Sequence, residues 1–370
     1  MKDNINRKIL IIGNGFDIAH HLPTRYIDFL DFFKNSDDEI FSYTLEHVRS
    51  GLPCRGKFSD LISNNDGIRK MARLDRIQSM EKILRENVWA KYFAGCEADI
   101  VGWIDFEREM LPVFNLFQEI FLKSKTAIVY KTNNDIKARI EMDGQVQSKR
   151  AALFDKYFIA DPTKKHVIVT NGFSGLTYGV FKEKLLDDLR KELDLFIEAF
   201  GIYLEEIVGN IEVREDPLIQ DIHADVVLSF NYTSTEYSYR NLEAAEHYYV
   251  HGSVGNTPYK MVMGVDKVDN DGQNEFIYFE KYFQRMRKGL LKNYNELVSK
   301  RNMVMVYGHS LDKTDIDILE LFLGTAEKVK IFYYNEEDYE RKTINLIKMF
   351  GRNKIEEDLC SRRIEFIATS

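Results

Sequence analysis

The chain opens with a short, continuous run of apolar residues. Ile9 to Ile12 leads into Gly13-Asn14-Gly15, and a helix-compatible segment follows. A run without polar interruptions is typical of a parallel strand that is buried on both faces. In doubly wound α/β proteins, a strand, a glycine turn and a helix in this order present backbone N–H groups to a nucleotide phosphate. The opening therefore predicts the first strand and the ligand-facing turn of such a fold.

The middle of the chain has mainly helical periodicity. Residues 25–50 and 68–122 are predicted to be mostly helical, and residues 181–209 show the same mixture of charged and apolar positions. Between them, residues 124–180 carry shorter β-prone runs separated by turn-forming residues, which predicts a small irregular insertion. In one segment, apolar residues recur at three- and four-residue steps and form a stripe, which is typical of a helix face packed into a core. It consists of Trp103, Phe106, Met110, Phe114, Phe117 and Phe121.

From residue 225 the pattern changes to short β-prone runs that alternate with helical segments. The helical segments lie at about residues 276–300, 314–325 and 337–350. This alternation predicts a parallel sheet with crossover helices. The β-prone runs are residues 226–230, 247–251, 261–263, 303–307, 329–333 and 364–367.

We therefore predict one discontinuous α/β domain with an insertion. Residues 1–35 and 220–370 would form a Rossmann-like, doubly wound domain with a mainly parallel sheet. Residues 36–219 would form a large, mostly helical insertion with its small β-containing segment near residues 124–180. The 370 residues, 44% of them hydrophobic, suffice for a buried core and two lobes.

Composition narrows the cellular setting and the partners. The 59 acidic and 51 basic residues give a formal net charge of −8, which disfavours nucleic acid as a partner. Cys54, Cys96 and Cys360 lie far apart and form no CxxC pair, so a disulfide framework and a zinc ribbon are both disfavoured. The first residues are polar, and the apolar run after them is too short for a signal peptide or a membrane span. We expect a soluble, cytoplasmic protein without membrane association.

Two candidate catalytic residues follow predicted strands. Asn231 comes directly after the run 226–230, and His251-Gly252 ends the next run. Both positions fall at the carboxyl edge of the sheet, where open α/β proteins bind their ligands. An amide and an imidazole at that edge can hold a ribose and accept a hydroxyl proton, because histidine titrates near neutral pH. The competing interpretation of His251 is a buried side chain with a structural hydrogen bond.

The glycine turn differs from a dehydrogenase fingerprint. It lacks the third glycine of G-x-G-x-x-G, which argues against hydride transfer. Asp17 follows the turn, where it either caps the helix or bonds a ribose hydroxyl. Gly308-His309-Ser310 follows another apolar run, and its glycine and hydroxyl suit a close approach of the backbone to a ligand.

The acidic residues of the C-terminal half favour local roles. Asp312, Asp315 and Asp317 are interpreted as helix-capping and first-turn residues, which the helix dipole favours. A metal role for them is the weaker interpretation. The segment 269–272 superficially suggests a calcium loop but lacks its terminal glutamate at the required spacing. We therefore predict no metal.

Motifs spread over the chain resemble a divergent sirtuin-type (Sir2-like) nucleotide site. In that superfamily a G-A-G-x-S turn, a G-I-P-x-F segment, a strand-ending Q-N-x-D, a catalytic H-G and a late G-T-S-L occur in this order. Thr233 stands here at the position of the sirtuin aspartate. The zinc-binding cysteine quartet of protein deacetylases is absent from the sequence, which disfavours deacylation of acyl-lysine. The counterparts are residues 13–17, 22–26, 230–233, 251–252 and 308–311.

More closely, the chain resembles the bacteriophage abortive infection AbiH family. The similar segments are IGNGFDIAHHLPTRYIDFL, WIDFE, SFNYTSTEY, VHGS and YGHSLDKTDIDIL, which span residues 8 to about 318. This resemblance implies a role in bacterial defence against phage, with an unknown phage-derived trigger, and the sirtuin-like site implies NAD as the ligand. By position, Asn231 would orient the nicotinamide ribose and a water, and His251 would be the general base. The residues expected to contact NAD are Gly13, Asn14, Gly15, Phe16, Asp17, Thr24, Tyr232, Gly252, Gly308, His309 and Ser310.

Three functions stay open at this point. The leading hypothesis is an antiphage effector that hydrolyses the nicotinamide–ribose bond of NAD. The second is a sensor that binds a nucleotide without cleaving it. The third is a metal-dependent nuclease acting on tRNA or phage nucleic acid through basic stretches such as residues 69–76 or 281–292. Each of them is compatible with a homo-oligomer.

Overall fold

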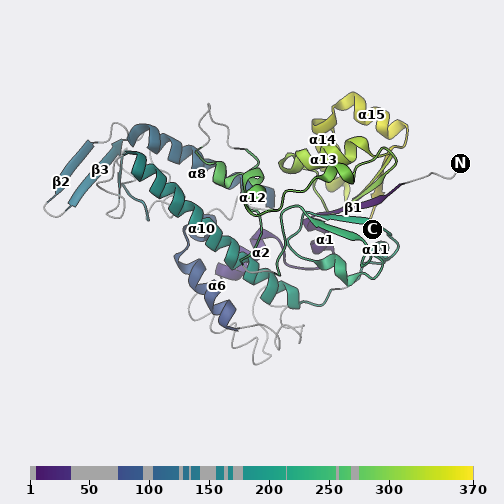
Figure 1. Ribbon diagram of the computed structural model, residues 1–370, viewed down its shortest axis with the longest axis horizontal. Helices are drawn as coiled ribbons and strands as arrows, with labels where there is room; N and C mark the ends of the chain where they lie inside the picture. Colours follow the sequence, from purple (N-terminus) through teal and green to yellow (C-terminus); the bar gives the residue numbers. More distant parts are fainter. Residues whose placement is uncertain are drawn as a thin grey trace.

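The computed structural model combines an α/β lobe with an elongated, mainly helical region (Figure 1). The long helix α10 (Tyr178–Glu206) runs from the α/β lobe toward a small antiparallel sheet at the far end. No helix in the described part of the chain is long and apolar enough to cross a membrane. The structure describes residues 6–34, 74–94, 103–124, 128–132, 135–141, 156–161, 166–169, 178–213, 215–255, 258–267 and 275–369.

The α/β lobe contains a six-stranded sheet in which every neighbouring pair is parallel. The order across the sheet is β10-β9-β8-β1-β6-β7. Counted along the chain within this sheet, this is the strand order 3-2-1-4-5-6 of doubly wound α/β proteins. The predicted parallel sheet is therefore confirmed. Its strands are β1 (Lys8–Ile12), β6 (Val226–Ser229), β7 (Glu246–Tyr249), β8 (Met303–Tyr307), β9 (Lys328–Tyr333) and β10 (Ile364–Ala368).

Both faces of this sheet are covered, which explains the uninterrupted apolar run of β1. Ile9 and Ile11 belong to one buried cluster, whereas Leu10 and Ile12 belong to another. Alternate residues of a strand point to opposite faces, so a strand buried on both sides has no polar positions. The first cluster includes side chains of α13 (Ile316–Thr325), α14 (Glu336–Phe350) and α15 (Arg352–Cys360). The second includes side chains of α1 (Asn14–Ala19) and α11 (Pro217–Gln220).

The strand order reverses beside β1, and this creates the crevice that positions the site. From β1 the chain continues to β6 and β7 on one side, and β8 to β10 lie on the other. Ile12 is in register with Ser229 of β6 and with Tyr307 of β8. The residues after these three strands therefore leave the sheet at the same level. Ligands of open α/β sheets bind at such a switch point.

The helical region packs around a core rich in aromatic side chains. Trp89, Phe93, Phe196 and Phe200 are fully buried in it, and Phe29 lies among them. The helicity predicted for residues 25–50, 68–122 and 181–209 is confirmed where the structure describes these ranges; residues 35–73 and 95–102 lie outside the described part. Besides α10, the helices of this region are α2 (Tyr26–Lys34), α6 (Leu74–Glu86), α7 (Val88–Ala94) and α8 (Trp103–Ser124).

The β-containing insertion is more regular than predicted. Its four strands form an antiparallel sheet in the order β2-β3-β5-β4. The sequence indicated only runs near the first and last of them along the chain. The strands are β2 (Ile128–Thr132), β3 (Asp135–Glu141), β4 (Phe158–Asp161) and β5 (His166–Val169).

Two predictions for the C-terminal half are wrong. Residues 261–263 form no strand, because the Gln284 side chain satisfies the backbone of Met263 by accepting from its N–H at 3.1 Å and donating to its C=O at 2.7 Å. The helix expected over residues 276–300 is reduced to α12 (Lys281–Arg287), which is followed by Gly289 at φ +69°. Glycine readily adopts this conformation, which ends the helix.

Candidate functional site

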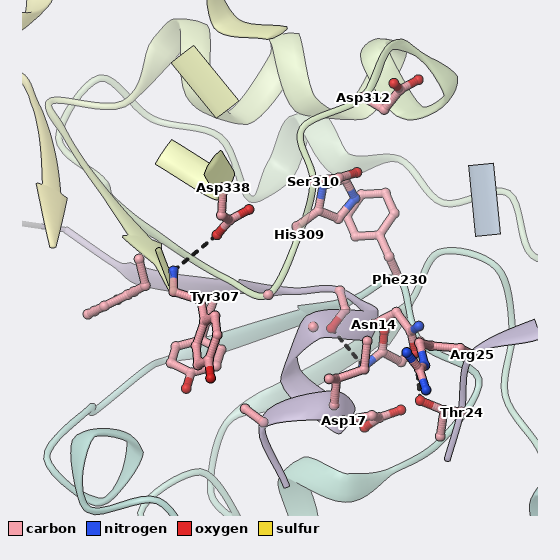
Figure 2. A pocket seen from close by; sticks show the side chains of 18 of the residues that line it. Asn14, Asp17, Thr24, Arg25, Phe230, Tyr307, His309, Ser310, Asp312 and Asp338 are labelled. Atoms are coloured by element: carbon pink, nitrogen blue, oxygen red, sulfur yellow. Dashed lines mark hydrogen bonds between the residues drawn. The ribbon is translucent and has the colours of Figure 1, made fainter. Parts of the chain in front are cut away.

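A cavity of about 1140 Å³ lies at the carboxyl edge of the parallel sheet, at the switch point. It is lined by residues that follow β1, β6, β8 and β9. Figure 2 shows Asn14, Asp17 and Thr24 on one side of it, and His309 with Ser310 on another. Most of the predicted site residues share this cavity. They are Gly13, Asn14, Gly15, Asp17, Thr24, Asn231, Tyr232, His251, Gly308, His309 and Ser310.

Phe16 and Gly252 were also predicted to contact a ligand, but neither lines the cavity. Phe16 is fully buried behind the turn, where its ring packs against Tyr239 and Tyr307. Gly252 adopts φ +77°, and a Cβ there would lie 1.8 Å from the carbonyl oxygen of Lys260. Both residues thus have a packing role that explains their identity.

The glycine turn is packed directly against the loop after β8. Gly13 donates to the Tyr307 carbonyl at 3.2 Å, and Gly15 donates to the Gly308 carbonyl at 2.8 Å. A Cβ on Gly15 would lie 2.8 Å from Gly308 Cα, and one on Gly308 would lie 2.1 Å from Phe16 N. The glycines are therefore required for the close approach of two loops of the protein itself, which the sequence interpretation did not foresee.

Asn231 ties the end of β6 to this turn. Its side-chain Nδ2 donates to the Gly13 carbonyl at 3.1 Å. The Ser229 hydroxyl accepts from the Asn231 backbone N–H at 3.2 Å, which shapes the chain as it leaves the strand. Because Nδ2 is directed to Gly13, the amide oxygen is the acceptor that Asn231 can offer to a ligand or a water.

Asp17 lines the cavity and is not a helix cap. The N-cap of α1 is Gly13, with no side-chain cap bond, and Asp17 lies within the helix, 1% exposed. The Thr233 hydroxyl donates to its Oδ2 at 2.5 Å, whereas its buried Oδ1 has no partner among the described residues. Burial raises the pKa of Asp17 to about 6, although the hydroxyl of Thr233 opposes this shift. Nearby, the Thr24 hydroxyl donates to Asn14 Oδ1 at 2.7 Å.

His251 lies two residues beyond β7 and is paired with an aspartate. Its Nε2 is 2.8 Å from Oδ1 of Asp315, and its buried Nδ1 has no partner among the described residues. The Phe230 ring meets the imidazole edge-on, with ring centroids 5.6 Å apart. Burial lowers the pKa of His251, with Asp315 opposing the shift. His251 is therefore neutral at pH 7 and can accept a proton.

Asp315 also faces two other groups. Lys281 Nζ, in α12, donates to Oδ1 at 3.4 Å, and His309 Nε2 lies 3.7 Å from Oδ2. Burial opposes ionisation of Asp315, but the Lys281 ammonium together with His251 holds its pKa well below the usual range. Burial lowers the pKa of His309 to about 4. The buried carboxylate of Asp315 is thus surrounded by one ammonium and two neutral imidazoles.

The sequence interpretation missed the role of Asp315, which it treated as a capping or first-turn residue. Asp315 does occupy the N-cap position of α13, but its side chain makes no cap bond there. The carboxylate is directed instead to His251, which is 64 positions away along the chain. Lys281, in one of the basic stretches on which the nuclease hypothesis depended, is buried. No local spacing signals either contact.

The start of α14 forms a further wall of the cavity that the sequence did not indicate. Asp338 accepts from Lys342 Nζ at 2.7 Å and from the backbone N–H of Tyr334 at 3.1 Å. Arg341 pairs with the same carboxylate at 2.8 Å (Figure 2 shows Asp338).

In the described part of the chain, the cavity included, no group of three or more His, Cys, Asp or Glu side chains is arranged to hold a metal ion.

The strand order and the polar cavity at its switch point define a doubly wound α/β protein. The family model described as bacteriophage abortive infection AbiH matches residues 9–334. The chain therefore belongs to the AbiH family of abortive-infection antiphage proteins, as its sequence segments predicted. No match was found among the curated proteins or among the solved structures.

Proposed function

We propose that this AbiH protein hydrolyses the nicotinamide–ribose bond of NAD through a sirtuin-like site. One observation carries the proposal: Asn231 and His251, which the sequence resemblance assigns to catalysis, line the same cavity at the switch point as the glycine turn. A position at this crevice is the one that doubly wound folds use for dinucleotides.

The cavity suits a ligand of this class in size and chemistry. Its volume of about 1140 Å³ is comparable to the largest usual ligand sites, roughly 300–1,000 Å³. The Asp17 carboxyl, with its partnerless Oδ1, supplies an acceptor for a ribose hydroxyl or an amide N–H. His251 supplies a neutral base that is shielded from water by burial.

The proposed reaction needs one bond broken, one formed and one proton removed. As the bond between the nicotinamide nitrogen and the ribose carbon breaks, its electron pair neutralises the nicotinamide ring. The oxygen of a water then bonds to the ribose carbon, and His251 accepts the proton that this water loses. Asn231 Oδ1 would orient the water or the ribose. Nicotinamide, ADP-ribose and one proton are the products.

The direct test is to incubate the purified protein with NAD, alone and with phage lysate, and to separate the products. We expect nicotinamide release, and we expect His251→Ala to lower the rate at least about 10²-fold, because general base catalysis contributes about that much. The thermal midpoint should confirm that the variant is folded. Absence of nicotinamide release under both conditions would reject hydrolysis.

A second candidate is a nucleotide sensor that does not cleave its ligand. It is favoured by the hydrogen bonds that already engage Gly13 N, Gly15 N and Asn231 Nδ2 within the protein. Calorimetry distinguishes the two candidates, because a sensor would bind NAD with measurable heat and form no product.

A further inference from the structure

We propose that Asp315 is a positioning residue that fixes the tautomer of His251, so that Nδ1 is left as the proton acceptor of the ring. His309 and Lys281 would hold Asp315 in place for this task. The catalytic consequence rests on the proposed NAD hydrolysis, whereas the assignment of the tautomer does not.

The contact between His251 and Asp315 determines where the ring proton lies. An imidazole nitrogen 2.8 Å from an ionised carboxylate oxygen must carry a hydrogen, because the carboxylate can only accept. The neutral ring then has its lone pair on Nδ1. This atom is buried and has no hydrogen-bond partner among the described residues. A buried acceptor without a partner is rare in native proteins, and here it belongs to a ring that lines the cavity.

The ring of His309 is held in the same tautomer as the ring of His251. The backbone N–H of Leu311 donates to His309 Nδ1 at 3.0 Å, which leaves the proton on Nε2, the atom that faces Asp315. Leu311 adopts φ +58°, an uncommon conformation for a leucine. Both nitrogens of His309 are thus directed to the protein itself. We therefore assign His309 to the support of Asp315.

Lys281 and Phe230 complete the arrangement. The Lys281 ammonium balances the buried carboxylate, so the group carries no net charge while both histidines are neutral. The Phe230 ring meets His309 edge-on at 4.4 Å between centroids and His251 at 5.6 Å, which restricts the planes of both rings. When His251 Nδ1 takes the proton of the attacking water, Asp315 stabilises the imidazolium that forms.

The first measurement needs no activity. In long-range ¹H–¹⁵N NMR spectra of the full-length protein, we expect His251 and His309 to show the pattern of the Nε2–H tautomer. In Asp315→Asn, the amide can accept from one ring and must donate toward the other, so one histidine should change its tautomer. Glu320→Gln, an exposed carboxyl-to-amide change on α13, is the matched control. A wild-type His251 protonated on Nδ1 would overturn the proposal.

The second measurement is the rate of NAD hydrolysis. Asp315→Asn should lower kcat by about 10²–10⁴-fold, the usual contribution of a general base, with KM near the wild-type value. A wild-type kcat in this variant would overturn the proposal. If the wild-type protein does not hydrolyse NAD but the NMR result holds, the proposed function fails and the tautomer assignment stands. If the variant does not fold, the wild-type spectrum alone decides the assignment.

Discussion

Two carboxyl groups in the same cavity have opposite ionisation properties. Asp17 is 1% exposed and Asp315 is 9% exposed, so burial favours the neutral acid in both. Asp315 nevertheless ionises readily, because Lys281 and two imidazoles surround it, and its pKa lies well below the usual range. Asp17 has threonine hydroxyls and no cation beside it, and burial raises its pKa to about 6. The neighbouring charges, and not the depth of burial, separate the pKa values of the two carboxyl groups.

This difference assigns different tasks to the two ends of the cavity. A carboxyl that is ionised at every working pH can orient a histidine permanently. A carboxyl that titrates near pH 6, with one oxygen unpartnered, can respond to a ligand or exchange a proton with it. Pairs of acids whose environments separate their pKa values are typical of catalytic sites.

The largest expected effect comes from removing the cation beside Asp315. Lys281→Met would leave a buried carboxylate uncompensated, and we expect a loss of about 3–5 kcal/mol in the free energy of unfolding. Urea denaturation at pH 7.5 measures it. Lys281→Met combined with Asp315→Asn should recover part of the loss, because the charge is removed as well.

Lys348→Met, an exposed lysine on α14, is the matched control and should change the free energy of unfolding little. A loss in Lys281→Met no larger than that of the control would show that the ammonium does not compensate Asp315. The contrast between the two carboxyls would then need another cause.

Asp17 should give a stability effect of opposite sign. Its folded pKa of about 6 lies above the ordinary aspartate value of 3.8, so the folded state binds the proton more tightly. The stability from this group is therefore complete below about pH 4 and is lost as the pH rises through 6. The difference corresponds to about 3 kcal/mol. Asp17→Asn cannot ionise, so relative to wild type it should gain about that amount between pH 4 and pH 8.

Urea denaturation at a series of pH values follows this difference. Asp221→Asn, an exposed aspartate at the end of α11, is the control and should follow the wild-type curve. Parallel curves for Asp17→Asn and wild type would mean that Asp17 ionises as easily in the folded protein as in the unfolded one.

The comparison of the two carboxyl groups also shows which structural features of this protein the sequence predicts and which it does not. The continuous apolar run of β1 and the β-prone runs after residue 225 predicted the parallel sheet, because strands buried on both faces leave a local pattern. The position of the sheet edge followed from these strands, since Asn231 lies two residues after β6 and Gly308 directly after β8. These features depend on residues that are neighbours in the chain.

The pairing of Asp315 with His251 leaves no such pattern. An aspartate at the start of a helix predicts an N-cap, and only the tertiary structure shows that its carboxylate is directed elsewhere. The same reason explains the wrong strand at residues 261–263. Met263 has strand-like backbone bonds, but its partner is the side chain of Gln284 and not another strand.

The smallest effect tests the hydrogen bond from Thr233, one of three threonine hydroxyls that stabilise ionised Asp17. The Thr233 hydroxyl donates to Oδ2 at 2.5 Å, and a donor stabilises the charged form of a carboxyl. Thr233→Val should therefore raise the pKa of Asp17 further and cost about 1.5 kcal/mol at pH 8, with a smaller cost at pH 5, where the carboxyl is mostly neutral. Carboxyl ¹³C NMR titration measures this pKa, and Thr233→Ser, which keeps the hydroxyl, should retain the value near 6. If Thr233→Val leaves the pKa unchanged, the hydroxyl does not stabilise the charged form. Burial and the nearby Glu236, opposed by the hydroxyls of Thr235 and Thr24, would then set the ionisation of Asp17. The comparison with Asp315 would reduce to the presence or absence of Lys281 and the histidines.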